Sequence, residues 1–152
     1  MLQLMKVESG ATVLDAGYGP GEHSIRVARE NCQVCAIDIS QTMLQEAITR
    51  VEKVGMSHAV EFQQQDLTHL NFPDESFQYV FSWGVIIHIR EIEKALDELS
   101  RITKHGCKLA LYVTNKTAWD YTFESFARFL LRKPQSGLES LPMGDGVWYH
   151  MN

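Results

Sequence analysis

The sequence predicts an α/β fold in which helices cover both faces of a mostly parallel sheet. Two observations lead to this prediction. Short apolar runs bounded by turn residues alternate with segments whose apolar residues recur at helical spacing, which is the β-α-β-α order of a parallel sheet. The first apolar run, residues 12–16, ends in a cluster of glycines, where the chain can turn from strand to helix. The length of 152 residues suits one domain with a substantial core.

The strands and helices are expected in regular alternation. Strands are predicted at residues 12–16, 33–37, 60–64, 77–82 and 108–113. Helices are predicted at residues 22–30, 41–54, 92–103 and 119–132, each with its apolar residues on one face. Ser40 is a suitable N-terminal cap for the second of these helices. His105 and Gly106 are expected to close the third as a C-terminal cap.

Composition and charge argue against several kinds of partner. The net charge is −5, and no run of Lys or Arg stands out, whereas nucleic-acid-binding proteins usually carry a basic face. No stretch approaches the roughly 18 apolar residues that a membrane span requires. The N-terminus lacks the apolar core and the cleavage site of a signal peptide. We therefore expect a cytoplasmic protein without a nucleic-acid or membrane partner.

Cys32 and Cys35 form a C-x-x-C pair, which in other settings marks a redox centre or half of a zinc site. Here the two cysteines fall at the end of a predicted helix and inside a predicted strand, and no second ligand pair follows. We interpret them as packed thiols, and we expect no metal.

The segment V-L-D-A-G-Y-G-P-G-E is the most informative motif. Gly17, Gly19 and Gly21 stand between a strand and a helix, where glycine permits positive φ and close approach of a ligand to the backbone. A dinucleotide fingerprint would need glycine at Glu22, and a Walker loop would need G-K-S/T. A glycine turn without any ligand gives a similar pattern, so the loop alone is weak evidence for a ligand-binding site.

Two aspartates strengthen the case for a nucleoside ligand. Asp38 ends the second strand, where a carboxylate can accept hydrogen bonds from both hydroxyls of a ribose. Asp66 ends the third strand and could bind the amino group of an adenine. Ile39 and Leu67 follow these aspartates and could hold the purine between apolar faces. Either aspartate alone is more often a helix cap or a solvated loop residue.

Together these motifs resemble the class I S-adenosylmethionine-dependent methyltransferases, and most of all the small-molecule group that includes ubiquinone and menaquinone biosynthesis enzymes. The matching stretches are V-L-D-A-G-Y-G-P-G, A-I-D-I-S, Q-Q-D-L, F-P-D-E-S-F-Q-Y-V-F-S-W-G-V-I-I-H-I and L-S-R-I-T-K-H-G-C-K-L. The resemblance implies a Rossmann-like, doubly wound, mostly parallel sheet. It also implies S-adenosyl-L-methionine as cofactor and methyl transfer by in-line displacement to a small-molecule acceptor.

The resemblance assigns the cofactor-binding residues. They are Asp15, Ala16, Gly17, Gly19, Asp38, Ile39, Asp66, Leu67 and Ser82. Asp15, Gly17 and Gly19 would line the methionine part, and Ser82 would approach the amino-acid group. Asp38 holds the ribose, Asp66 binds the adenine amino group, and Ile39 and Leu67 flank the ring. Two departures stand out: Tyr18 replaces a small residue, and His105-Gly106-Cys107 replaces Pro-Gly-Gly.

No catalytic residue can be named from the sequence. A general base is needed only where the acceptor must lose a proton, and His88 is the candidate. The favoured interpretation of His88 is nevertheless structural, as a cap of the following helix or a neighbour of Trp83. Trp83 and Tyr18 are candidates for shaping the acceptor pocket, with core packing the favoured role for Trp83.

The family sheet has two further strands that the sequence does not supply. We expect one domain over residues 1–152, with a core at 4–115 and a helix and tail at 116–152, and we expect the tail to stop before another strand is made. Either the tail near residues 147–149 folds back on the edge of the strand at 108–113, or two chains meet there. We favour a homodimer, through this edge or the tail, or cover of the edge by the helix at 119–132. The alternatives to an active methyltransferase are a non-catalytic cofactor-binding module, an inactive fragment, and a related nucleoside-binding enzyme.

Overall fold

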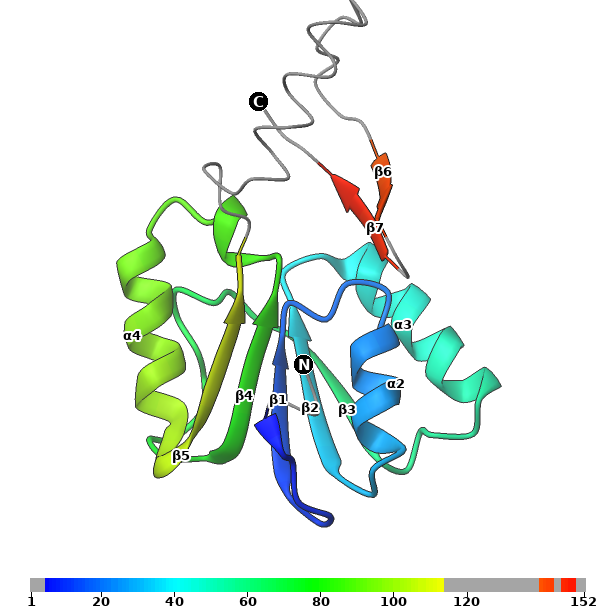
Figure 1. The fold of residues 1–152 in the computed structure, drawn as a ribbon, viewed down its shortest axis with the longest axis horizontal. Helices are drawn as coiled ribbons and strands as arrows, with labels where there is room; N and C mark the ends of the chain where they lie inside the picture. The colour runs from blue at the N-terminus through cyan, green and yellow to red at the C-terminus, as the bar shows by residue number, and fades with distance from the viewer. Residues whose placement is uncertain (1–4, 114–139, 144–145, 150–152) are drawn as a thin grey trace, which may run out of the picture. The chain divides into compact units, whose positions relative to one another are not determined.

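A computed structural model describes residues 5–113, 140–143 and 146–149 (Figure 1). The chain divides into two compact units, Met1–Thr114 and Asn115–Asn152. The first unit contains a five-stranded sheet, and the second contains a two-stranded sheet. Treatment of the whole chain as a single domain stays a prediction.

The five-stranded sheet is wholly parallel. Its strands are β1 (Thr12–Ala16), β2 (Gln33–Asp38), β3 (Val60–Gln64), β4 (Phe77–Trp83) and β5 (Thr103–Tyr112), in the spatial order β3-β2-β1-β4-β5. The chain proceeds outward from β1 to β3, then returns to the other side of β1 for β4 and β5. This reversal between β1 and β4 is a topological switch point, and open α/β sheets bind ligands at the carboxyl ends of strands at such a point.

The helices are α2 (Glu22–Ala28), α3 (Gln41–Lys53), the short 3-10 helix η1 (Ile86–His88) and α4 (Ile92–Ile102). Ser40 caps α3 as predicted, since its hydroxyl accepts a hydrogen bond from the Met43 N–H over 3.4 Å. Gly21 precedes α2 with a φ of 83°, a conformation that favours glycine.

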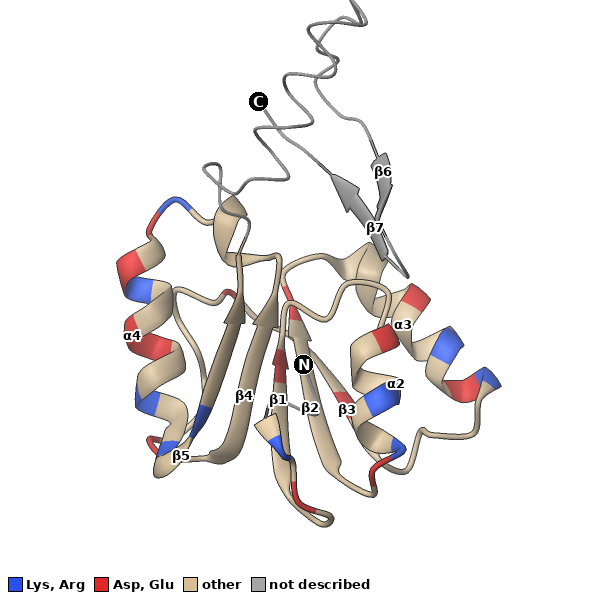
Figure 2. Ribbon diagram, in the orientation of Figure 1, with Lys and Arg blue, Asp and Glu red and all other residues tan. Residues whose placement is uncertain are grey.

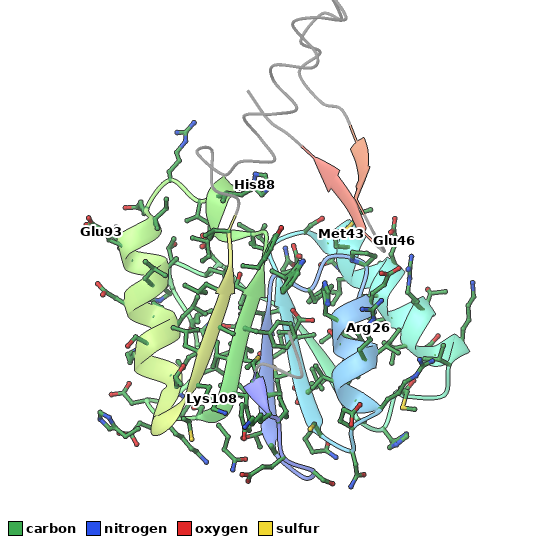
Figure 3. The ribbon with its side chains drawn as sticks, viewed as in Figure 1. Arg26, Met43, Glu46, His88, Glu93 and Lys108 are labelled. Carbon is green, nitrogen blue, oxygen red and sulfur yellow. The ribbon has the colours of Figure 1, made fainter. Side chains whose placement is uncertain are left out.

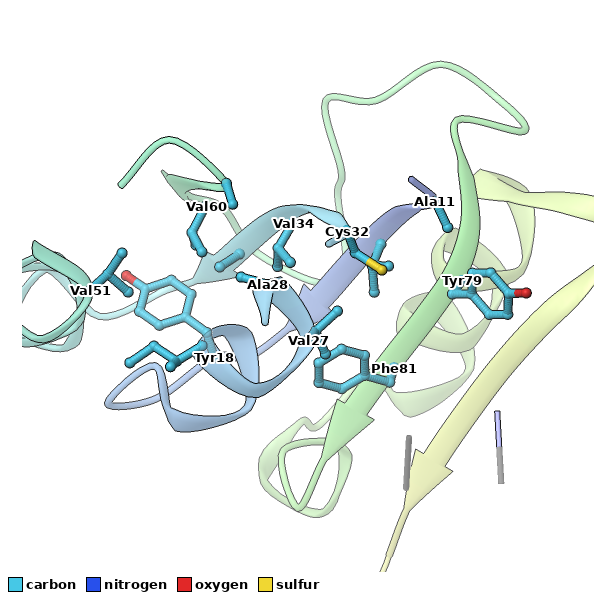
Figure 4. Packing of buried hydrophobic residues seen from close by; sticks show 14 of the residues in the cluster. Ala11, Tyr18, Val27, Ala28, Cys32, Val34, Val51, Val60, Tyr79 and Phe81 are labelled. Atoms are coloured by element: carbon cyan, nitrogen blue, oxygen red, sulfur yellow. The ribbon is translucent and has the colours of Figure 1, made fainter. Parts of the chain in front are cut away.

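Successive residues of β1 face two separate core clusters, as the alternating side chains of a strand require. Val13 belongs to a cluster that includes residues of α2 and α3 (Figure 4). Leu14 belongs to a second cluster that includes Leu99 and Ile102 of α4. The predicted doubly wound arrangement is therefore confirmed.

The connection between β3 and β4, residues 65–76, contains no helix. Leu67 and Leu70 from this connection are buried in the same cluster as α4, and Phe72 packs against it. The connection therefore covers part of the sheet face that a crossover helix would otherwise cover.

The boundary between α4 and β5 differs from the prediction. The helix ends at Ile102 and β5 begins at Thr103, so His105 and Gly106 lie within the strand and do not cap the helix. The Thr103 hydroxyl donates a hydrogen bond of 2.6 Å to the Leu99 carbonyl, which satisfies one of the free carbonyls at the helix end. Gly106, at a φ of 74°, accommodates the shift in register between β4 and β5 near this point.

The tail also differs from the prediction, because it does form strands. β6 (Ser140–Met143) and β7 (Gly146–Tyr149) pair in antiparallel fashion. The sequence between them is Gly144-Asp145, a combination typical of two-residue hairpin turns. Neither strand belongs to the five-stranded sheet. The helix predicted at residues 119–132 lies outside the described residues.

Within the described ranges, no helix is long and apolar enough to cross a membrane. The same ranges hold no group of three or more His, Cys, Asp or Glu side chains placed to bind a metal. Cys32 and Cys35 are free thiols, the first buried and the second half-buried, and burial raises the pKa of both.

Candidate functional site

A cavity of about 320 Å³ opens at the carboxyl ends of the strands, beside the switch point. Its lining comes from the segments that follow β1, β2, β3 and β4. The lining residues are Gly17, Asp38, Ile39, Gln65, Asp66, Leu67, Thr68, Val85, His88, Ile89, Arg90 and Glu91. Figure 3 shows His88 at this end of the sheet and Lys108 toward the opposite end.

Most of the residues predicted to bind a cofactor meet around this cavity. The predicted residues in its lining are Gly17, Asp38, Ile39, Asp66, Leu67 and the base candidate His88. Asp15, Ala16, Gly19 and Ser82 are not in the lining, and Ala16 is fully buried.

Sequence reasoning missed half of the lining residues. Gln65 and Thr68 flank Asp66, so the motif around that aspartate could have indicated them. The others, Val85 and residues 89–91, follow β4 in and around η1. No periodicity marked them, because their position depends on how the chain returns over the sheet.

The glycine loop takes its shape from close backbone contacts. Gly17 has a φ of 88°, and its N–H donates to the Ile37 carbonyl over 2.7 Å. A Cβ on Gly17 would lie 2.3 Å from a methyl carbon of Val85, so this position admits only glycine without movement of Val85. By contrast, nothing lies within 4 Å of the place where a Cβ on Gly19 would be.

Asp38 joins the glycine loop to the end of β2. One of its carboxylate oxygens accepts the Gly19 N–H over 3.1 Å, and the other accepts the Ser40 N–H over 2.9 Å. A carboxylate oxygen can accept more than one hydrogen bond. The side chain is only partly buried, so the carboxylate can still accept hydroxyl hydrogens from a ligand.

Asp66 sits in a tight turn at the start of the β3–β4 connection. Its Oδ1 accepts hydrogen bonds from the Thr68 N–H over 2.9 Å and from the Thr68 hydroxyl over 2.8 Å. These bonds hold the pKa of Asp66 below its ordinary value, which keeps the group an acceptor. Ile39 is 66% exposed and Leu67 only 7%, so one apolar wall of the cavity is open and the other is fixed in the core.

Asp15 is a buried carboxyl group beneath the glycine loop. It is 1% exposed, and its Oδ2 accepts a hydrogen bond of 2.6 Å from the Ser24 hydroxyl. Burial raises its pKa to about 7, the Asp38 charge adds to the rise, and the Ser24 bond opposes it. Among the described atoms, neither Asp15 Oδ1 nor the buried Ser82 Oγ has a hydrogen-bond partner. Unpaired buried polar atoms are uncommon.

Tyr18 does not narrow the cavity or point outward. It is 2% exposed and packs edge-on against Phe62, with ring centroids 5.2 Å apart. Figure 4 shows its ring among the residues of the core cluster on the α2 and α3 side. Burial also raises the pKa of its hydroxyl.

Trp83 and His88 lie in different surroundings. Trp83 stacks on Tyr112 at 4.2 Å, and the His23 ring lies 5.3 Å from it. His88 is exposed on η1, and the residue at the N-terminal cap position of α4 is Glu91. The interpretation of His88 as the cap of α4 is therefore wrong. His23 was not singled out in the sequence, and burial is the main cause of its lowered pKa.

Known proteins share both the sequence pattern and the fold. Residues 13–106 match the methyltransferase domain family. A demethylmenaquinone methyltransferase from Listeria welshimeri is 30% identical over 136 residues, which cover 86% of this chain and 57% of the relative. The chain thus spans little more than half the length of the curated relatives that it matches.

Solved structures agree with this relationship. A SAM-dependent methyltransferase from Aquifex aeolicus superposes with a TM-score of 0.70 at 25% identity, over 93% of this chain and 79% of that one. A phosphoethanolamine N-methyltransferase from Haemonchus contortus, solved in complex with S-adenosyl-L-methionine, gives a TM-score of 0.69 at 27% identity. That match covers 84% of this chain and 31% of the other. The chain therefore belongs to the methyltransferase domain family, in its class I, S-adenosylmethionine-dependent group.

Proposed function

We propose that this chain binds S-adenosyl-L-methionine in the cavity at the carboxyl ends of the strands and takes part in methyl transfer to a small-molecule acceptor. The observation that supports this most directly is the contact between Asp38 and Gly19. This contact places a carboxylate next to a glycine-rich backbone loop. The carboxylate could bind the ribose, and the loop could bind the methionine part attached to it.

The residues around the cavity fit the parts of this cofactor. Asp38 would accept hydrogen bonds from the ribose hydroxyls, and the Asp66 carboxylate would accept a hydrogen bond from the amino group of adenine. Ile39 and Leu67 would flank the ring. These roles use groups that line one cavity and follow consecutive strands.

The fit extends to the methionine part. Asp15 Oδ1 and Ser82 Oγ are buried and have no hydrogen-bond partner within the described part of the chain, so an amino-acid group could satisfy them. Gly17 and Gly19 would let the ligand approach the backbone. Ala16 is fully buried, so its contribution would come through its main chain.

The chemistry divides simply between ligand and protein. When bound, the sulfonium supplies the methyl group, which an acceptor attacks in line. The residues of this chain would hold the reacting groups in alignment and exclude water. His88 would act as a base only for an acceptor that must lose a proton, and its place beside the adenine-binding residues does not favour that role.

The acceptor class rests on the relatives. The Listeria welshimeri protein is named for a small molecule, demethylmenaquinone. Acidic and basic residues are interspersed over α2, α3 and α4 (Figure 2), a pattern unlike the basic face that nucleic-acid binding requires. A cytoplasmic location remains part of this proposal.

A second copy of the chain is the proposed partner at the edge of β5. Within the described residues, β5 pairs with β4 and with no other strand. Leu111 on β5 is 38% exposed, and Val113, just after the strand, is 50% exposed; exposed apolar edges recruit partners.

Side-by-side calorimetric titration with S-adenosylhomocysteine and NAD tests the proposed function. S-adenosylhomocysteine should bind saturably and NAD should not, because Glu22 stands at the third glycine position of a dinucleotide fingerprint. Saturable NAD binding tighter than that of S-adenosylhomocysteine would overturn the assignment. Methyl transfer to a panel of small acceptors then separates an enzyme from a non-catalytic binding module.

A further inference from the structure

Arg101 and Glu98 of α4 form hydrogen bonds with the backbone of the β3–β4 connection. The Arg101 guanidinium donates to the Phe72 carbonyl over 2.7 Å and to the Leu70 carbonyl over 3.1 Å. Glu98 Oε2 accepts the Leu70 N–H over 2.7 Å. The two side chains bind each other through two further bonds, of 2.8 and 2.9 Å. Three backbone groups of one short segment are thus tied to one ion pair.

This ion pair is a fixed unit rather than a loose surface contact. The side chains of Arg101 and Glu98 are 30% and 20% exposed. The hydrogen bond from Arg101 is the main cause that lowers the pKa of Glu98 to about 2. A planar guanidinium can make these bonds at the same time, whereas an ammonium group cannot reproduce them.

The segment held by these bonds, residues 66–72, begins at two residues that line the cavity. Asp66 and Leu67 lie three to four residues before Leu70, and no helix or strand stiffens the chain between them. The Gln65 side chain accepts the Asn71 N–H over 2.9 Å, so the segment closes into a loop. The hydrogen bonds to the backbone of Leu70 and Phe72 therefore fix the C-terminal end of the loop that carries Asp66.

We propose that Arg101 and Glu98 are positioning residues for adenine recognition, and that they act by holding the loop at residues 66–72 so that Asp66 faces the amino group of the purine. This inference rests on the proposed function. Neither side chain lines the cavity, so both act through the backbone. The competing role is a purely structural one, in which the ion pair only attaches α4 to the rest of the fold.

A pair of nucleosides separates these two roles. S-inosylhomocysteine carries an oxygen where S-adenosylhomocysteine carries the amino group, so the affinity ratio of the two reports how well the Asp66 carboxylate is placed. A site that hydrogen-bonds a ligand N–H discriminates strongly against an analogue without it. General destabilisation of the fold would weaken both ligands alike and leave the ratio unchanged.

The variants are Arg101→Lys, Glu98→Gln and the matched control Asp74→Asn. Asp74 also pairs with Arg101, over 2.8 Å, but its side chain is 75% exposed and it does not bind residues 66–72. In the unchanged protein we expect S-adenosylhomocysteine to bind at least about tenfold more tightly than S-inosylhomocysteine. Arg101→Lys and Glu98→Gln should reduce this preference to about twofold, and Asp74→Asn should keep it.

Hydrogen exchange of the Leu70 amide, measured without ligand, provides a second readout. Exchange should quicken in Arg101→Lys and Glu98→Gln and stay unchanged in Asp74→Asn. Folded variants that keep the full preference for adenine would overturn the inference, even if Leu70 exchanges faster. If the unchanged protein binds neither nucleoside, the proposed function itself fails, and the adenine role of the ion pair fails with it.

Discussion

The Ser24 hydroxyl donates a hydrogen bond of 2.6 Å to the Asp15 carboxyl group, and this buried contact joins α2 to β1 directly beneath the glycine loop. It lowers the pKa of Asp15, but burial outweighs it and raises that pKa to about 7. Asp15 is therefore poised near neutral pH, with one oxygen that has no partner among the described atoms. A positively charged ligand group beside it would shift the balance toward the carboxylate.

Ligand binding should therefore release a proton. In the free protein at about pH 6.5, a group with a pKa of about 7 is mostly protonated. The ammonium of S-adenosylhomocysteine would lower that pKa, so a fraction of a proton should leave on binding. Calorimetry in two buffers of different ionisation enthalpy measures this release. The apparent enthalpies should differ for the unchanged protein and converge for Asp15→Asn; equal values in both buffers for the unchanged protein would exclude Asp15 from the site.

The same carboxyl group should affect stability without ligand. Its pKa rises from 3.8 to about 7 on folding, so the folded state binds the proton more tightly than the unfolded state does. Its contribution to the free energy of unfolding is fully present below about pH 3.8 and is lost as the pH rises through about 7. Urea denaturation at pH 5 and pH 8 measures the free energy of unfolding. This free energy should fall more from pH 5 to pH 8 in the unchanged protein than in Asp15→Asn. A parallel loss in both proteins would assign the pH dependence to other groups.

Local patterns in the sequence predicted the parts of this site that depend on neighbours along the chain. Ser40 caps α3, and Asp38 ends β2 beside Gly19, because strand ends and caps are set within a few residues. Tyr18 was harder, since its burial against Phe62 depends on where β3 packs. The α4–β5 boundary was also missed, because the Thr103 hydroxyl and the pairing with β4 end the helix before the expected glycine cap.

The role of the β3–β4 connection could not be predicted for the same reason. Arg101 is about thirty residues from the carbonyls that it binds, and no spacing rule relates the two segments. The sequence placed Asp66 at the end of a strand but gave no sign of what holds its loop. Local patterns thus predict which residues line the cavity better than they predict which residues hold its loops in place.

Replacement of Asp38 by alanine should weaken S-adenosylhomocysteine at least tenfold. A carboxylate that accepts ribose hydroxyls contributes charge-assisted hydrogen bonds of roughly 1.5–3 kcal/mol each. Loss of the Gly19 contact would also loosen the glycine loop. Calorimetry gives the dissociation constant, and Asp97→Ala, at an exposed carboxylate on α4, serves as control. An unchanged constant in Asp38→Ala would remove this residue from the site.

Gly17→Ala and Gly19→Ala form a matched pair. Both glycines have positive φ, so both substitutions strain the backbone. Only the Cβ at Gly17 would collide with Val85, at 2.3 Å, and Val85 lines the cavity. We therefore expect Gly17→Ala to lower both the melting temperature and the affinity for S-adenosylhomocysteine more than Gly19→Ala does. Equal effects of the two substitutions would show that backbone strain, and not the contact with Val85, decides the outcome.

The edge of β5 should make the chain self-associate. Among the strands that the structure describes, β5 pairs only with β4, and Leu111 on this strand is 38% exposed. Open strand edges with apolar side chains favour pairing with another chain. Light scattering over a concentration series should show a dimer that Leu111→Lys disrupts, because a charge at the contact must be desolvated. Ile92→Lys, at a residue 41% exposed on α4, should leave the association unchanged. A monodisperse monomer at every concentration, with β5 amides that exchange freely, would show that this edge is tolerated without a partner.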